Sequence, residues 1–99
     1  MSNEIEIELS EDLEVQEPKK YNVFLLNDDY STMEFVIDVL VKIFRKTVSE
    51  AEAIMLNVHN NGKGLCGVYS FEIATTKVAQ VKTMAREKGF PLKATMEEE

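Results

Sequence analysis

Apolar residues gather in short runs along residues 19–96, and their spacing predicts alternating strands and helices. The continuous run over residues 21–27 (YNVFLLN) is typical of a largely buried strand, and it stops at polar residues. Apolar residues then recur at helical spacing, which predicts a helix that a capping box of Ser31 and Glu34 opens. A second box, of Ser49 and Glu52, predicts another helix, which Gly62 closes.

The second half of the chain carries similar signals. Residues 66–69 (CGVY) predict a short strand, and Ser70 is suited to cap a third helix that ends at Gly89, with Ile73 and Val81 facing inward. Residues 90–96 have room for a last strand, whose start Pro91 places at a sheet edge. The order β-α-α-β-α-β favours an α+β fold, a small single domain in which three helices pack on a three-stranded antiparallel sheet.

Charged residues divide the chain into three parts. Of 99 residues with a net charge of −7, residues 1–17 hold seven acids and no base, residues 18–96 hold eight acids and eleven bases, and residues 97–99 are all Glu. We predict a flexible acidic N-terminal extension over residues 1–18, a core domain over residues 19–96 and an acidic C-terminal end over residues 97–99. In the extension, Glu alternates with Ile5, Ile7 and Leu9, a pattern that also allows a strand.

Composition narrows the class of protein. The 44% of hydrophobic residues can fill one modest core, and no apolar stretch approaches the ~20 residues of a membrane span. The N-terminus lacks the basic start of a signal peptide, and the single cysteine, Cys66, cannot form an internal disulfide, so we expect a cytoplasmic protein. The net negative charge resides at the ends and does not by itself exclude an anionic partner, but residues 18–96 show no clustered basic stripe, which argues against a nucleic-acid partner because phosphates select basic surfaces.

The polar residues Asn27, Asp28 and Asp29 directly follow the first predicted strand. One interpretation is a turn, in which these side chains bond their own backbone. The other is a cluster of acceptors for a cation or an ammonium group. His59, the only histidine, either complements the negative end of its helix or offers a neutral ring nitrogen as an acceptor.

A metal-dependent enzyme or metal-binding protein that uses Asp28, Asp29, His59 and perhaps Cys66 is the main alternative from another class. The sequence has no HExxH or CxxC motif and no calcium-loop spacing, and a cysteine inside a short strand is usually buried and inert. We therefore expect no metal site and no cofactor.

Three strings of residues together resemble the ClpS family over about residues 20–96: YNVFLLNDDYSTMEFVIDVL, IMLNVHNNGKGLCGVYSFEIATTKV and the closing FPL. This family consists of bacterial adaptors that deliver N-end-rule substrates to the ClpA–ClpP protease. The resemblance implies a non-catalytic, monomeric adaptor that binds the free N-terminus of proteins starting with Phe, Tyr, Trp or Leu. Its partners would be these N-degron substrates and the N-terminal domain of ClpA or a related Clp unfoldase, with no nucleic acid and no membrane. A relative that keeps the ClpA surface but binds another ligand is a third alternative.

The resemblance also implies roles for individual residues. The α-amino group would be bound by Asn27, Asp28, Asp29 and His59, and Met33 would exclude β-branched first residues. Glu72 and Lys77 would dock ClpA, although Thr75 stands where many relatives carry an acid. Residues 1–17 would engage the unfoldase. The pocket for the first side chain would be lined by Leu26, Ser31, Met33, Val36, Met55, Val58 and Leu92.

The chemistry of the proposed amine site agrees with these roles. An α-ammonium group has three donors and no acceptor, whereas an amide oxygen, a carboxylate and a neutral imidazole all accept hydrogen bonds. An internal peptide N–H has a single donor and would leave such a cluster partly unpaired, at a cost of roughly 1–3 kcal/mol. A cluster of this kind can therefore require the start of a chain.

Overall fold

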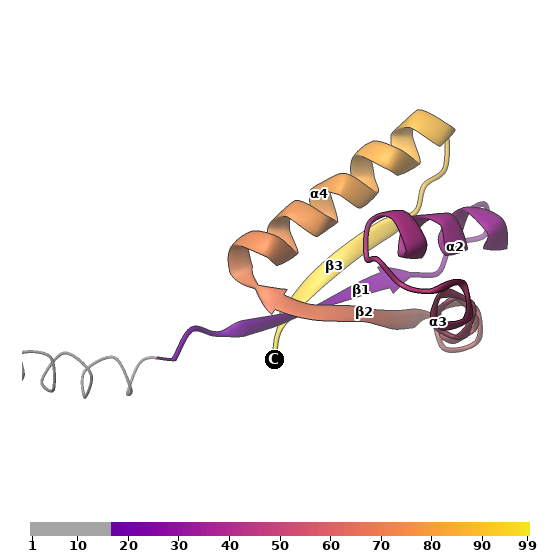
Figure 1. Cartoon of the computed structure of the whole chain (residues 1–99). Helices are drawn as coiled ribbons and strands as arrows, with labels where there is room; N and C mark the ends of the chain where they lie inside the picture. Colours follow the sequence, from indigo (N-terminus) through magenta and orange to yellow (C-terminus); the bar gives the residue numbers. More distant parts are fainter. Residues whose placement is uncertain (1–16) are drawn as a thin grey trace, which may run out of the picture.

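The computed structural model describes residues 17–99, and the predicted extension lies outside the described residues up to residue 16. The described elements follow the predicted order β-α-α-β-α-β (Figure 1). They are β1 (Lys20–Leu26), α2 (Met33–Lys42), α3 (Val48–Asn61), β2 (Lys63–Ser70), α4 (Phe71–Lys88) and β3 (Lys93–Glu98). None of these helices is long and apolar enough to cross a membrane.

The three strands form one antiparallel sheet with β1 at its centre, in the order β2-β1-β3, which confirms the predicted fold class. Leu26, the last residue of β1, pairs with Lys63 of β2 and with Lys93 of β3. The register between β1 and β2 shifts between Val23 and Phe24. Because β1 is central, the residues that follow it emerge between the start of β2 and the start of β3.

The helices cover one face of this sheet and enclose the core. In Figure 1, α4 runs across the sheet, and it contacts all three strands, whereas α3 packs between α2 and β2. The core is apolar throughout, with no buried polar residue among those described. Its fully buried side chains, which come from both the sheet and the helices, include Val23, Leu25, Val39, Leu40, Cys66 and Val81.

The start of α2 differs from the prediction by one residue. Thr32, not Ser31, caps the helix, and its Oγ1 accepts a hydrogen bond from Phe35 N at 3.1 Å. The predicted box of Ser31 and Glu34 is wrong because Ser31 belongs to the preceding turn, where its backbone N–H donates to Asp28 Oδ1 at 2.6 Å. Ser and Thr are both good caps, so the contact with Asp28 decides between them.

The start of α3, in contrast, is earlier than predicted. The capping box is formed by Thr47 and Glu50, with both hydrogen bonds present, and the predicted box of Ser49 and Glu52 is wrong. The end of α3 is as predicted: Gly62 has a φ of 90°, and its N–H donates to Val58 O. Only glycine adopts this left-handed conformation at no steric cost.

The boundaries of α4 are as predicted, with Ser70 as its cap and Gly89 at its end, where φ is 76°. The inner face differs at its first turn, because Ile73 is half exposed and Ala74 is buried. Ala74, Val81 and Ala85 recur at helical spacing on the sheet side, which leaves Ile73 outside.

Strand β3 begins and ends later than the predicted strand over residues 90–96. Its last two residues, Glu97 and Glu98, pair with β1, and their carboxylates lie 3.2 Å from the Nζ atoms of Lys63 and Lys19. These two glutamates are therefore part of the sheet, and Glu99 N also donates to Lys20 O.

Candidate functional site

The polar turn after β1 is organised by Asp28. Its Oδ1 accepts hydrogen bonds from Tyr30 N at 2.8 Å and from Ser31 N at 2.6 Å. Its Oδ2 and the nearby Ser31 Oγ are buried and make no hydrogen bond with the described residues. The turn interpretation of Asp28 is therefore correct, and one carboxylate oxygen is left over for another role.

The pKa of Asp28 lies below its ordinary value. Burial raises the pKa, but the nearby Ser31 hydroxyl and the backbone N–H groups of Ser31 and Tyr30 stabilise the charged form by more, so the pKa is lowered overall. A carboxylate held ionised next to a surface hollow favours a cationic ligand there.

A small hollow lies where α2, α3 and the turn after β1 meet, with a volume of about 30 Å³. This is room for about one or two water molecules. The hollow brings together most of the residues implied for the first-residue pocket and two of those implied for the amine, namely Asn27, Ser31, Met33, Val36, Met55, Val58 and His59.

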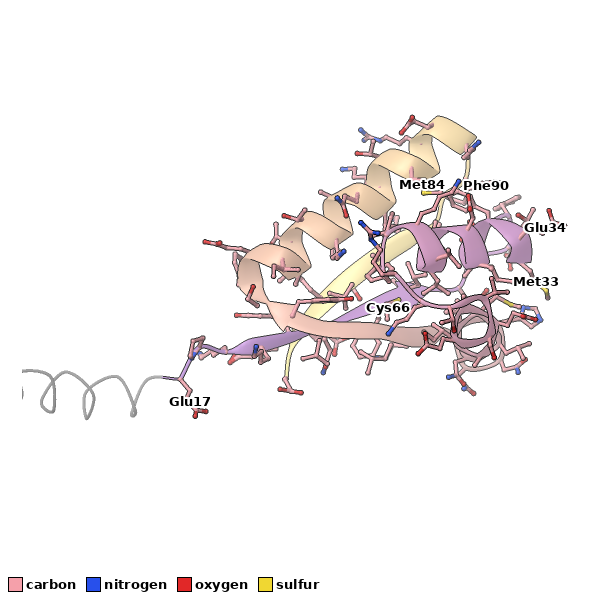
Figure 2. The ribbon with its side chains drawn as sticks, viewed as in Figure 1. Glu17, Met33, Glu34, Cys66, Met84 and Phe90 are labelled. Atoms are coloured by element: carbon pink, nitrogen blue, oxygen red, sulfur yellow. The ribbon has the colours of Figure 1, made fainter. Side chains whose placement is uncertain are left out.

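The apolar part of the hollow has a buried floor and an exposed rim. Val36 of α2 and Met55 and Val58 of α3 are buried, because they belong to the apolar stripes that pack the two helices together. Met33, the first residue of α2, is 49% exposed (Figure 2). Methionine side chains are flexible, so the rim and the floor can both change shape.

The polar rim of the hollow comes from two elements joined by the backbone. Asn27 follows β1, and His59 lies in the last turn of α3, and both side chains are exposed. Asn27 N donates to Gly62 O at 2.8 Å, which ties the end of β1 to the end of α3. This bond holds together the two backbone segments that carry the acceptors.

The remaining candidates lie outside this hollow. Asp28, Asp29 and Leu26 line a neighbouring cavity of about 360 Å³, which shares Asn27 with the hollow. Tyr30, Pro91 and Lys93 also line it. Sequence reasoning missed them, because Lys93 reaches this place only through its pairing with Leu26. Leu92 is buried and lines a third cavity, between α4 and β3.

The two residues implied for ClpA docking have different surroundings. Glu72 is exposed in the first turn of α4. Lys77 is partly buried, and its Nζ donates to the carbonyl oxygen of Ile43, the C-cap of α2, at 2.6 Å. The same Nζ lies 5.9 Å from the centre of the Tyr69 ring. Lys77 therefore ties α4 to the end of α2, a structural role that the sequence did not indicate.

Cys66 is unsuited to chemistry. Its side chain is only 1% exposed, and burial raises the pKa of its thiol to about 12, so no thiolate forms near neutral pH. Among residues 17–99, no three His, Cys, Asp or Glu side chains come close enough to hold a metal ion. The metal-centred alternative is therefore not supported by the described part of the chain.

Comparison with known proteins identifies the family to which this chain belongs. Residues 16–95 match the model of the family described as ATP-dependent Clp protease adaptor protein ClpS. The chain belongs to the ClpS family. A ClpS protein named as a Clp protease adapter in Wolinella succinogenes is 53% identical over 96 residues, which cover 97% of this chain and 94% of that protein. The ClpS protein of Maricaulis maris is 57% identical over 84 residues, 85% of this chain and 77% of the relative.

A solved structure extends the comparison to ligand binding in a relative. Agrobacterium tumefaciens ClpS2, bound to L-phenylalaninamide, has a TM-score of 0.81 and 40% sequence identity with this chain, and covers 84% of this chain and 100% of ClpS2. The ligand of that protein is a single amino acid with a phenyl side chain and a free amino group. Proteins of the ClpS family are adapters of a protease and not enzymes themselves.

Proposed function

We propose that this chain is an adaptor that binds the free N-terminus of proteins starting with Phe, Tyr, Trp or Leu. It delivers these N-degron substrates to the ClpA unfoldase, or a related one, for degradation by ClpP. The observation that carries the proposal is the hollow in which Asn27 and His59 stand at the rim of an apolar floor. The phenylalaninamide bound to the relative from A. tumefaciens supports the same ligand class.

The amine site of the proposal consists of acceptors of different kinds. The three donors of an α-ammonium group would be shared among Asn27, His59 and the acids of the turn, directly or through water. The lowered pKa of Asp28 keeps that residue negative near neutral pH, where the ammonium group is charged. An acetylated N-terminus carries no charge and one donor, so it cannot satisfy this set.

The side-chain pocket of the proposal must open when a ligand enters. A volume of about 30 Å³ is far smaller than a leucine or phenylalanine side chain. The side chains of Met33 and Met55 can move without a change in the backbone. Such a movement would expose Val36 and Val58 to the ligand. Burial of one such side chain contributes roughly 1.5–3 kcal/mol, which together with the amine contacts suits the moderate affinity of a delivery factor.

Binding to labelled peptides, followed by fluorescence anisotropy, tests the proposal. Peptides starting with Phe or Leu should bind, and their Nα-acetylated forms should not. His59→Ala should weaken binding by at least ~1 kcal/mol, about fivefold, because a hydrogen bond to a charged group is lost. Asn60→Ala is the matched control, since Asn60 is exposed on the next position and does not line the hollow. Equal affinity for free and acetylated peptides would overturn the amine site.

A scan over all twenty first residues would separate this proposal from a family member that has changed its ligand. Elemental analysis of the purified protein addresses the metal-binding alternative, which requires a stoichiometric metal ion.

We further propose that the adaptor acts in the cytoplasm as a monomer and docks the unfoldase through the exposed start of α4, around Glu72. Deletion of residues 2–17 should then spare peptide binding and impair degradation of a Phe-starting substrate by ClpA–ClpP. A loss of peptide binding in this deletion would contradict the assignment of those residues to delivery.

A further inference from the structure

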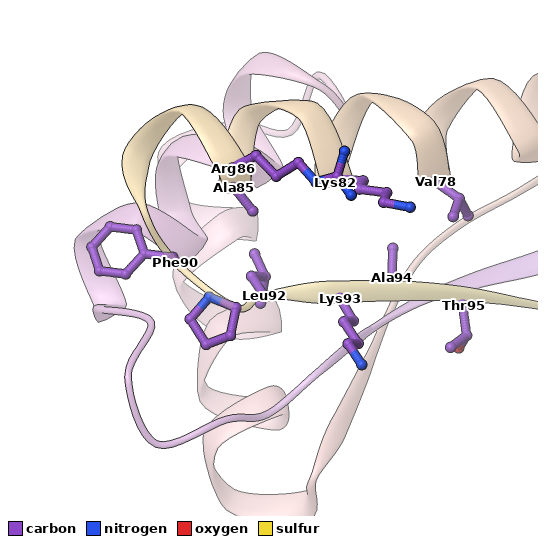
Figure 3. Close-up of a pocket in the computed structure, with 10 residues that line it drawn as sticks. Val78, Lys82, Ala85, Arg86, Phe90, Leu92, Lys93, Ala94 and Thr95 are labelled. Atoms are coloured by element: carbon purple, nitrogen blue, oxygen red, sulfur yellow. The ribbon is translucent and has the colours of Figure 1, made fainter.

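A cavity away from the candidate site combines apolar walls with basic charges. It lies between the C-terminal half of α4 and the segment that leads into β3, and its volume is about 410 Å³ (Figure 3). It shares no residue with the hollow around Met33. Small-molecule sites in proteins commonly have volumes of about 300–1,000 Å³, so the cavity is large enough for such a ligand.

The apolar part of the cavity has a buried floor and half-buried walls. Ala85 of α4 and Leu92 form the floor and are 2% and 3% exposed. Val78, Phe90 and Ala94 also line the cavity, and each is only partly buried. In Figure 3, Leu92 and Ala94 point toward α4. A ligand with an apolar body would remove the exposed part of these walls from water.

The charged residues that line the cavity are all basic. Lys82 and Arg86 lie one turn apart on α4, and Lys93 is at the start of β3; all three are exposed. None of them forms an ion pair with another residue of the range 17–99. Because no acid in the lining compensates this charge, the cavity favours an anion.

The apolar walls and two of the bases lie on the same side of α4. Val78, Lys82 and Ala85 recur at helical spacing, and Arg86 follows Lys82 by one turn. The occupant must therefore present its apolar and its negative part to the same side. An alternating strand cannot do so, because its apolar and charged side chains face opposite ways. A small molecule with an apolar body and a terminal carboxylate can.

We propose that this cavity binds a small amphipathic carboxylate with a hydrocarbon body. The body covers Leu92 and Ala94, and the carboxylate accepts hydrogen bonds from Arg86 and Lys82 at the rim. A guanidinium group can donate two parallel hydrogen bonds to one carboxylate, which gives Arg86 the larger part in holding it. The site is independent of the proposed peptide-binding function, whose ligand is a cation.

Titration of the full-length ¹⁵N-labelled protein with sodium octanoate, followed by NMR, tests the proposal. We expect saturable shifts of the backbone amides of Val78, Arg86 and Ala94, and none at Met33 or His59. Butanoate should bind at least about tenfold more weakly, because it has four fewer methylene groups to bury. An absence of saturable shifts around the cavity, or shifts at the hollow instead, would overturn the proposal.

Two charge removals provide the matched comparison. Arg86 and Lys88 are both exposed bases of the last turn of α4, but only Arg86 lines the cavity. Arg86→Gln should weaken octanoate binding by about three- to fivefold, as expected for the loss of an exposed ion pair. Lys88→Gln should leave it unchanged. Equal affinities of the two variants would show that the carboxylate is not bound at the rim.

Two other occupants of the cavity give different results in the same NMR experiment. A second copy of the chain would shift these amides when the protein is concentrated without octanoate. A lipid surface would broaden them when vesicles that contain phosphatidylglycerol are added. We expect neither change, and either one would replace the small carboxylate as the occupant and overturn the proposal.

Discussion

Gly64 of β2 lies against Val58 of α3 so closely that a Cβ atom on Gly64 would meet Val58 Cγ2 at 2.8 Å. The same atom would lie 3.0 Å from the backbone oxygen of Ile54. The absence of a side chain at position 64 therefore lets α3 approach the sheet and places Val58 at the floor of the hollow. This close approach, and not a special φ angle, explains the glycine.

Gly64→Ala should destabilise the protein by about 1–3 kcal/mol, as overpacking does, and should also weaken binding of a Phe-starting peptide because Val58 is displaced. Urea unfolding and fluorescence anisotropy measure the two effects. Gly89→Ala is the control: it strains a φ of 76° at the end of α4 by about 1–2 kcal/mol and should leave peptide affinity unchanged. Unchanged affinity in Gly64→Ala as well would show that the contact does not position the pocket.

Met33→Ala should admit peptides that start with Val or Ile, because it removes half-exposed bulk from the rim of the hollow. We expect at least about a fivefold gain in affinity for an Ile-starting peptide, a change of about 1 kcal/mol, in competition anisotropy. Leu56→Ala is a matched control, since Leu56 is also 49% exposed but does not line the hollow. Unchanged rejection of Ile by Met33→Ala would refute the gate.

Substitutions of Lys77 and Glu72 should have different effects, the first on the unfolding free energy and the second on binding to the unfoldase. Lys77→Met keeps most of the alkyl stem but removes the hydrogen bond to Ile43 O, which should cost about 1–3 kcal/mol of unfolding free energy. Glu72→Gln removes an exposed charge and should leave stability unchanged while weakening binding to the ClpA N-terminal domain. Full stability in Lys77→Met would contradict the tie between α4 and the end of α2.

Asp28→Asn should make the unfolding free energy depend less on pH under acidic conditions. Burial raises the pKa of Asp28, but its hydrogen bonds lower it below 3.8, so the charged form favours the folded state. That contribution is present above about pH 4 and is lost as the pH falls through the folded-state pKa. The Asn side chain keeps an oxygen for the N–H groups of Tyr30 and Ser31, so the hydrogen bonds of the turn are kept while the charge is removed.

The measurement for Asp28→Asn is the difference in unfolding free energy between wild type and variant as the pH is lowered. Glu50, whose pKa is lowered chiefly by its hydrogen bond to the Thr47 backbone, titrates in both proteins and cancels in the difference. A difference that stays constant between about pH 6 and pH 2 would show that the Asp28 charge does not stabilise the fold.

Local signals in the sequence predicted the element order, and distant contacts set the details that it missed. The glycines at positions 62 and 89 marked helix ends correctly, because the left-handed cap conformation is a property of the residue itself. The choice of Thr32 over Ser31 as a cap depends on the hydrogen bond that Ser31 N donates to Asp28, and the length of β3 depends on pairing with β1 and on Lys63 and Lys19. No local pattern contains these partners.

The candidate site also combines features that the sequence predicts with features that only contacts in the fold create. The acceptors and the apolar floor could be named from residue types and from the family resemblance, and the structure brings Asn27, His59 and the α2–α3 side chains together. The bond of Lys77 to Ile43 and the place of Lys93 beside the acidic turn depend on helix packing and strand register. These are properties of the assembled fold.

The hydrogen bond from Asn27 N to Gly62 O has a further consequence. It joins the end of the first strand to the end of the third element of the chain, and the two proposed amine acceptors stand on either side of it. The two acceptors are brought together only when this bond forms, so an unfolded chain lacks the proposed recognition site. We therefore expect an adaptor that is newly made or damaged, and so not folded, to bind no substrate. Delivery of substrates to the protease would then depend on the folding of the adaptor itself.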